Sequence, residues 1–141
     1  MKQLPSDIIL YEGNNELNIQ MPPIPEAEFV YVSDIRNVGI HYPPFPGGGE
    51  YFIIQVDVQN VGEVAGVCTI TAWWRSLIVG VWSGWTEVDT HPDWYEYGVR
   101  SVSLQPGEIG TLEWWVVNVL QASQEETRVT CEAGTLEARV K

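Results

Sequence analysis

The sequence predicts an all-β protein, and three observations support this. Apolar and polar residues alternate in several short runs, Gly, Asn and Pro separate those runs, and no convincing helix is present. The clearest pair of runs lies between Tyr51 and Trp74, joined by the turn-forming segment 60–66, and predicts a β-hairpin. The residues expected to face inward are Phe52, Ile54, Val56 and Val58 in the first strand, and Cys68, Ile70, Ala72 and Trp74 in the second.

Further strands are expected on both sides of this hairpin. One is predicted before it, at residues 29–32, and four after it, at residues 99–104, 111–120, 127–133 and 135–140. The segment 75–98 has the composition of a short hairpin followed by a long decorated loop. Together these elements predict an immunoglobulin-like Greek-key β-sandwich of about seven to nine strands, covering residues 26–141.

Residues 1–25 predict a separate N-terminal hairpin arm with a Pro-rich connector. The arm could pack on its own sandwich, or reach a neighbouring copy and complete that copy's sheet. Its apolar residues, which would serve assembly, are Ile8, Ile9, Leu10, Tyr11, Leu17 and Ile19.

Composition narrows the choice of partners. The chain has 141 residues, enough for one domain with a real core, and its 7 Lys plus Arg against 19 Asp plus Glu give a net charge of -12. Such a charge repels phosphate backbones and anionic lipid surfaces, so we expect neither nucleic acid nor membrane insertion. We also expect no signal peptide in this chain, because its first residues lack a long apolar run.

The two cysteines, Cys68 and Cys131, have neither metal-ligand nor redox-motif spacing. Both fall on the apolar faces of their predicted strands, so we expect two free core thiols. If the two strands are adjacent, however, a disulfide that closes a loop of roughly 60 residues would add about 4 kcal/mol of stability.

Aromatic residues are unusually frequent, with 7 Trp in one small domain. Trp74 and Trp114 are expected in the core, but the others exceed what one core needs. Exposed aromatic side chains mark either a protein interface or a stacking platform for sugar rings, and both alternatives remain open. The candidate residues are Trp73, Trp82, Trp85, Trp94, Tyr95, Tyr97 and Trp115.

Catalysis is not expected. The best cluster is Asp89, His91 and Asp93, which could contribute to a metal site of a hydrolase, but a solvated turn is the simpler interpretation. The serines lack a nucleophile-elbow context, and two histidines supply a catalytic triad poorly. We therefore predict a protein that is not an enzyme and has no cofactor or metal.

The turn segment 60–66, and the run LQPGE at 104–108 leading into TLEW at 111–114, resemble the bacterial cell-adhesion-related domain called CARDB. The resemblance covers residues 27–140 and implies a sandwich module, usually one of several in a longer chain, that spaces or binds at a cell or particle surface and does not catalyse. The chain departs from that family in its Trp-rich segment 73–97, in lacking an Asn-rich closing stretch, and in the expected absence of a signal peptide.

From these observations we expect a structural module that assembles with protein partners, as a homo-oligomer or within a larger particle such as a virion, where it would be a capsid decoration or tail component. The alternative is a carbohydrate-binding or cell-surface adhesion module that uses its exposed Trp residues. The expected location is a virion or an extracellular surface assembly.

Overall fold

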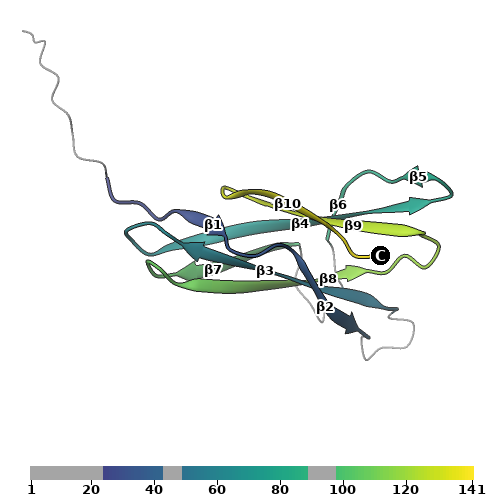
Figure 1. The fold of residues 1–141 in the computed structure, drawn as a ribbon, viewed down its shortest axis with the longest axis horizontal. Helices are drawn as coiled ribbons and strands as arrows, with labels where there is room; N and C mark the ends of the chain where they lie inside the picture. The colour runs from purple at the N-terminus through teal and green to yellow at the C-terminus, as the bar shows by residue number, and fades with distance from the viewer. Residues whose placement is uncertain (1–23, 43–48, 89–97) are drawn as a thin grey trace, which may run out of the picture.

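The computed structural model describes residues 24–42, 49–88 and 98–141. In these ranges the chain forms ten β-strands in two antiparallel sheets and no helix (Figure 1). The prediction of an all-β protein with two packed sheets is therefore confirmed. No helix in the described ranges is long and apolar enough to cross a membrane.

The first sheet is built around β3 (Tyr51–Asn60). One edge of β3 pairs along almost its whole length with β8 (Ile109–Val117). The other edge pairs in succession with β2 (Arg36–His41) and β1 (Phe29–Tyr31). All of these pairings are antiparallel.

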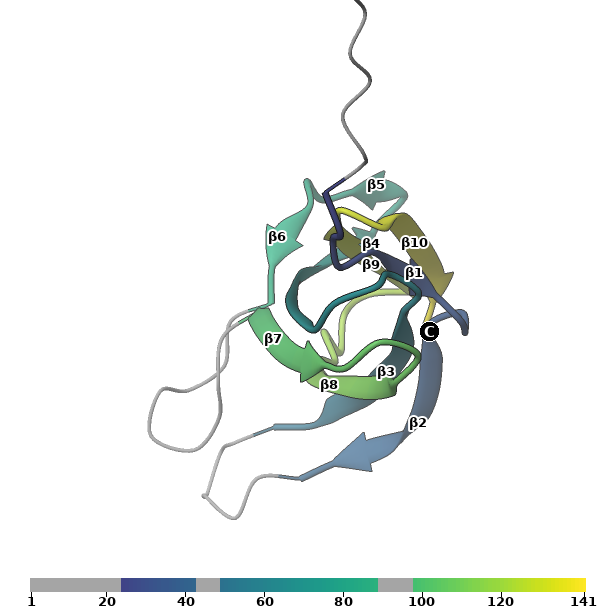
Figure 2. The ribbon, with the colours of Figure 1, turned by 90° about the vertical axis from the view of Figure 1, so that its left-hand side faces the viewer.

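The second sheet is built around β4 (Gly66–Ile78), the longest strand. One edge of β4 pairs with β9 (Gln124–Cys131), which in turn pairs with β10 (Gly134–Arg139). Three short strands follow one another along the other edge: β7 (Val99–Leu104), β6 (Thr86–Glu87) and β5 (Val81–Trp82). Seen along its long axis, the chain curls into a nearly closed profile (Figure 2).

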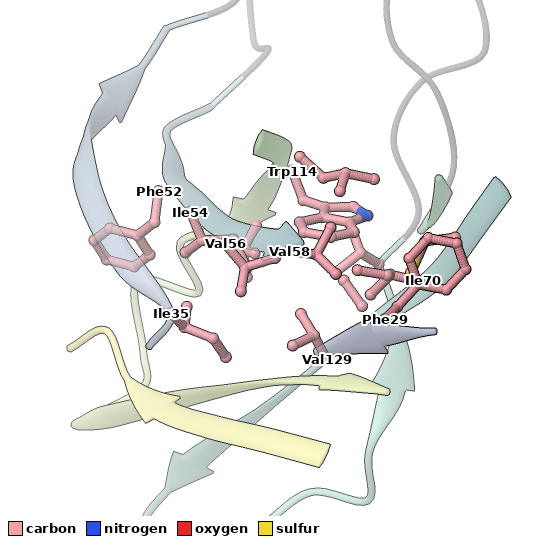
Figure 3. Packing of buried hydrophobic residues seen from close by; sticks show 14 of the residues in the cluster. Phe29, Ile35, Phe52, Ile54, Val56, Val58, Ile70, Trp114 and Val129 are labelled. Atoms are coloured by element: carbon pink, nitrogen blue, oxygen red, sulfur yellow. The ribbon is translucent and has the colours of Figure 1, made fainter. Parts of the chain in front are cut away.

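The core lies between the two sheets. The residues that the strands bury there follow the alternation of apolar and polar residues in the sequence. Every second residue of β3 is buried, as are the alternate residues of β4 from Cys68 to Ala72 (Figure 3). Trp114 is fully buried and donates its Nε1–H to the carbonyl oxygen of Gly98 at 2.7 Å. Trp74 is partly buried against the same cluster, so both tryptophans predicted for the core are found there.

A buried amide joins the segments at one end of the core. Asn60 is fully buried, and its Nδ2 donates to the carbonyls of Val64 and Leu104. Its Oδ1 accepts the backbone N–H groups of Glu28 and Gly62. One side chain therefore connects the start of β1, the β3–β4 turn and the end of β7.

The structure also differs from the prediction in places. Strand β2 was not expected, because a register shift between Asn37 and Gly39 interrupts its alternation. Strand β4 continues four residues beyond Trp74, and the segment after it holds β5 and β6, each only two residues long. A short hairpin was expected in the segment 75–98, so the unexpected β2 is the strand that raises the count to ten, above the predicted seven to nine.

Candidate interaction surface

The outer face of the second sheet carries a stack of alternating tryptophan and arginine side chains, which we call the Trp–Arg ladder: Trp82, Arg75, Trp85 and Arg128. The Arg75 guanidinium carbon lies 4.5 Å from the ring centroid of Trp82 and 4.7 Å from that of Trp85. That of Arg128 lies 4.1 Å from the ring centroid of Trp85. Both distances to Trp85 are within the range of a cation–π interaction, so this ring contacts two cations.

Strand register explains how the ladder forms. Along β4, Arg75 lies on the face opposite the buried residues. In the pairing of β4 with β9, Arg128 lies opposite Trp73, which is two positions from Arg75 on β4. The β4–β5 hairpin then returns the chain so that Trp82 pairs with Leu77. Side chains of residues far apart in sequence thus meet on one outer surface.

Each arginine of the ladder also has an acidic partner. Arg75 forms an ion pair with Glu126 at 2.6 Å, and Arg128 forms one with Glu137 at 2.6 Å. The guanidinium groups are therefore held from two sides, by a carboxylate and by an indole ring. This arrangement fixes the ladder in position and neutralises its charge.

Only some of the aromatic residues predicted to form a platform lie on the same surface. Trp73, Trp82 and Trp85 lie on the outer side of the second sheet and are all half-buried. The indole of Trp73 donates to Thr130 Oγ1 at 3.2 Å. Trp115 lies on the other sheet, where its ring stacks on His41 with centroids 3.6 Å apart, so it belongs to a separate surface.

The tip of the β4–β5 hairpin is apolar and strained. Val79 and Gly80 connect the paired residues Ile78 and Val81, and both have positive φ, at 50° and 75°. These angles match a two-residue type I′ turn, where Asn, Asp or Gly is favoured and a β-branched residue is an outlier. Val79 is also 93% exposed, and Val81 is 69% exposed.

A second connection reaches the same end of the sandwich. The chain between β8 and β9 lies beside the hairpin, where the Ser123 amide donates to the Leu77 carbonyl at 2.9 Å (Figure 1). Leu120 in this connection is 77% exposed. Neither residues 77–82 nor residues 118–124 include a charged side chain, and we call the surface formed by these two segments the uncharged end.

The charged residues Glu50 and Lys141 border the uncharged end, and both form hydrogen bonds with Asn118. Asn118 donates its Nδ2–H to Glu50 Oε1 and accepts a hydrogen bond from Lys141 Nζ at 2.9 Å. The chain enters the described region, at residue 24, at the opposite end of the sandwich (Figure 1). There a pocket of about 380 Å³ is lined by four glutamates, Glu26, Glu28, Glu63 and Glu132, and by no histidine, serine or cysteine.

Several predicted site residues lie outside the described residues. They are the aromatic residues Trp94, Tyr95 and Tyr97, the candidate ligands Asp89, His91 and Asp93, and the arm residues Ile8, Ile9, Leu10, Tyr11, Leu17 and Ile19. Among residues 24–42, 49–88 and 98–141, no group of three or more His, Cys, Asp or Glu side chains could hold a metal ion.

Neither the arginines of the ladder nor the strained tip was predicted from the sequence. The signal for the ladder was present in the spacing Trp82-Ser83-Gly84-Trp85 after an arginine-containing strand. The signal for the tip was Val79-Gly80 at the centre of an uncharged apolar run, where Asn-Gly or Asp-Gly would be the usual turn.

No family model matches the sequence, and no curated protein matches it. The fold is similar to part of several solved β-glucosidases. These include a saponin-metabolising enzyme from intestinal bacteria (TM-score 0.54, 17% identity), an enzyme from Erythrobacter marinus (TM-score 0.55, 16% identity) and DesR from Streptomyces venezuelae (TM-score 0.52, 17% identity).

The three alignments cover 81–82% of this chain but only 15–16% of each glucosidase chain. This chain therefore matches one small part of much longer enzymes. At this level of identity the likeness shows the fold alone, a two-sheet antiparallel β domain.

Proposed function

We propose that this chain is a non-catalytic, immunoglobulin-like Greek-key sandwich that associates with further copies of itself through the uncharged end, and so builds a larger assembly. The single observation that carries the proposal is the exposed, strained Val79 at the tip of the β4–β5 hairpin. The other features of the uncharged end support it.

The backbone of Val79 argues for a role beyond turn formation. A left-handed conformation costs a residue with a Cβ roughly 1–2 kcal/mol, and an Asn or Gly at this position would avoid much of that cost. A β-branched apolar side chain that is both strained and 93% exposed contributes little to the stability of the free chain. If a partner buried this side chain, the side chain would contribute favourably to the free energy of association.

If the partner is a second copy, charge restricts the surface through which the two copies can meet. With a net charge of -12, two copies repel each other over most of their surfaces. The uncharged end is a surface on which two copies can meet without placing like charges opposite one another. The apolar side chains available for burial there are Ile78, Val79, Val81 and Leu120.

The Trp–Arg ladder stabilises the position of the β4–β5 hairpin. An isolated two-stranded hairpin is marginally stable in water. Stacking of Trp82 on Arg75 holds the returning strand against the sheet, while Trp85 is held between β4 and β9 by Arg75 and Arg128. A rigid hairpin loses less entropy when its tip is buried.

The carbohydrate alternative has weaker support in the described residues. A sugar platform needs an open ring face, whereas guanidinium groups already lie over the rings of Trp82 and Trp85. The expectation that the larger assembly is a virion stays a prediction from the sequence.

The test is the solution mass of the full chain, measured by light scattering after size exclusion over a range of concentrations. We expect an oligomer that Val79→Asn converts to a monomer. At concentrations low enough for both proteins to be monomeric, the melting temperature of the variant should stay equal or rise because turn strain is relieved. Val67→Asn is the matched control, because Val67 is 57% exposed on β4 but away from the hairpin tip. This control should remain oligomeric.

Two results would overturn the proposal. One is a wild-type chain that stays monomeric at every concentration. The other is an oligomer that persists in Val79→Asn but is lost in the double variant Ile8→Asp/Leu10→Asp, which would transfer the assembly role to the N-terminal arm.

A further inference from the structure

Cys68 and Cys131 lie on adjacent strands of the second sheet and face the same side. The β4–β9 ladder pairs Ala72 with Val129 and Thr71 with Thr130, so the next position places Cys131 opposite Ile70, two residues from Cys68 along β4. Cys68 is fully buried, and Cys131 packs partly buried against the same core cluster. The two side chains are thus diagonal neighbours on the inward face of one sheet.

Both residues are free thiols, and the strand register makes them near neighbours. Burial, and secondly the nearby Cys131, raise the pKa of the Cys68 thiol to about 12. Cys68 is therefore a poor nucleophile by itself, and a reaction would have to begin at its neighbour.

Cys131 is the less buried of the two thiols, and so the one at which we expect an external reagent to react. It ends β9, and residues 132–133 then form the turn into β10, so its backbone is paired with Gly134 but lies beyond the last β4–β9 pair. The thiol donates to the Tyr31 hydroxyl at 3.2 Å, and the Ala133 amide donates to Sγ at 3.2 Å. Both contacts are part-buried, and Cys131 packs at the edge of the core cluster.

Backbone geometry requires only a small adjustment for a bond between the two residues. Diagonal neighbours in an antiparallel sheet have Cα atoms about 7–8 Å apart, slightly beyond the usual disulfide range of about 4.4–6.8 Å. The necessary movement is available at Cys131, because the strand ends there. Cys68 is held more firmly, since β4 is paired there with β7.

We propose that Cys68 and Cys131 form a reversible intramolecular disulfide when the folded protein meets a disulfide oxidant such as oxidised glutathione. The Cys131 thiolate attacks one sulfur of oxidised glutathione, which breaks its S–S bond and releases one glutathione thiolate. The Cys68 thiolate then attacks the Cys131 sulfur of the mixed disulfide and releases the second glutathione. The protein loses two electrons and two protons, and one glutathione disulfide becomes two glutathione thiols.

The bond would tie β4 to the end of β9 and close a covalent loop that contains strands β5 to β8. Because the bond would join residues 68 and 131, which are far apart in the sequence, it would strongly restrict the unfolded chain. Oxidation is therefore expected to stabilise the sandwich without changing its strand pairing.

The experiment incubates the full native chain with defined ratios of reduced and oxidised glutathione, followed by acid quenching. We expect intact mass to fall by two hydrogens, the thiol count in denaturant to fall from two to zero, and non-reducing peptide mapping to find Cys68 joined to Cys131. The melting temperature should rise by about 5 °C or more, and a reductant should reverse every change.

Two variants separate the steps. Cys68→Ala should stop at a mixed disulfide between glutathione and Cys131, and Cys131→Ser should remain unmodified because Cys68 is buried. The proposal is overturned if the wild-type chain keeps two free thiols under the most oxidising ratio, or if it forms only disulfides between copies. Modification of Cys68 in the Cys131→Ser variant would overturn the order of the two steps.

Discussion

The guanidinium carbon of Arg128 lies 4.1 Å from the ring centroid of Trp85, although the two residues belong to segments that are far apart in the sequence. Arg128 is held in this position from the other side by Glu137 on the neighbouring strand. The Trp85–Arg128 contact is therefore part of the fold of the outer face, and its strength can be measured.

A double-mutant cycle with Trp85→Leu and Arg128→Met should give a coupling energy of about 0.5–1 kcal/mol. Each single variant should lower the free energy of unfolding, because Trp85 also contacts Arg75 and Arg128 also pairs with Glu137. The free energies of unfolding of the wild type, the two single variants and the double variant are measured by urea unfolding.

The control for this cycle is Glu137→Gln, which removes the charge pair but leaves the indole contact. Because the Glu137 side chain is 47% exposed, this change should alter stability by less than about 1 kcal/mol. A coupling energy indistinguishable from zero between Trp85 and Arg128 would show that their stacking contributes nothing to the fold.

A second prediction concerns the buried Asn60. Replacement by Ala would leave the carbonyls of Val64 and Leu104 and the amides of Glu28 and Gly62 without this partner. Because buried polar groups without partners are costly, we expect Asn60→Ala to lower the free energy of unfolding by about 2–4 kcal/mol.

Asn37 supplies the matched control for Asn60. It is exposed and accepts a single backbone hydrogen bond from Gly39. Asn37→Ala should change stability by no more than about 0.5 kcal/mol in the same urea experiment. Equal effects of the two substitutions would contradict the role assigned to Asn60 in joining β1, the β3–β4 turn and β7.

The long strands could be predicted from the sequence because burial in an antiparallel sheet follows the same two-residue period as the side chains. The apolar inward residues of β3 were identified correctly, as was Trp114 of β8, whereas the buried Asn60 at the end of β3 was assigned to the turn. The residues of β2 were missed because the register shift at Asn37 breaks the period that makes a strand recognisable.

The candidate surface was harder to predict. Trp82 and Trp85 were identified as surface aromatics, but the arginine partners come from β4 and from β9, and only the strand register brings them together. The proximity of Cys68 and Cys131 has the same origin. The sequence permitted a disulfide on the condition that their strands are adjacent, and β4 and β9 are paired.

A third prediction uses the close approach of β1 to the β3–β4 turn. A Cβ added at Gly62 would overlap backbone atoms of Glu26, Ala27 and Glu28. Backbone atoms cannot swing aside as a flexible side chain can, so Gly62→Ala should displace the start of β1 and lower the melting temperature by several degrees.

Gly84 is the control for Gly62, because a Cβ there would meet no atom within 4 Å. Gly84→Ala should leave the melting temperature nearly unchanged. Hydrogen exchange gives a second measurement: only Gly62→Ala should accelerate exchange of the Val61 amide, which donates to the Glu28 carbonyl at 2.7 Å. Unchanged exchange at Val61 would contradict the predicted displacement.

The last prediction concerns the pH dependence of stability. Burial raises the pKa of the Glu125 carboxyl above its ordinary value of 4.5, and the Val119 amide and Lys141 only partly oppose this shift. The side chain is fully buried; Oε2 accepts the Val119 N–H at 2.9 Å, whereas Oε1 has no hydrogen-bond partner. The fold therefore favours the protonated carboxyl.

Because the folded pKa exceeds the unfolded one, the contribution of Glu125 to stability is fully present below the unfolded pKa and is lost as pH rises through the folded pKa. Glu125→Gln does not titrate, so its free energy of unfolding should increase relative to wild type as pH rises from about 4 to 8. Urea unfolding across this range measures the difference. A Glu125→Gln difference that stays constant with pH, or decreases, would show that Lys141 and the Val119 amide compensate the burial of this carboxylate in full.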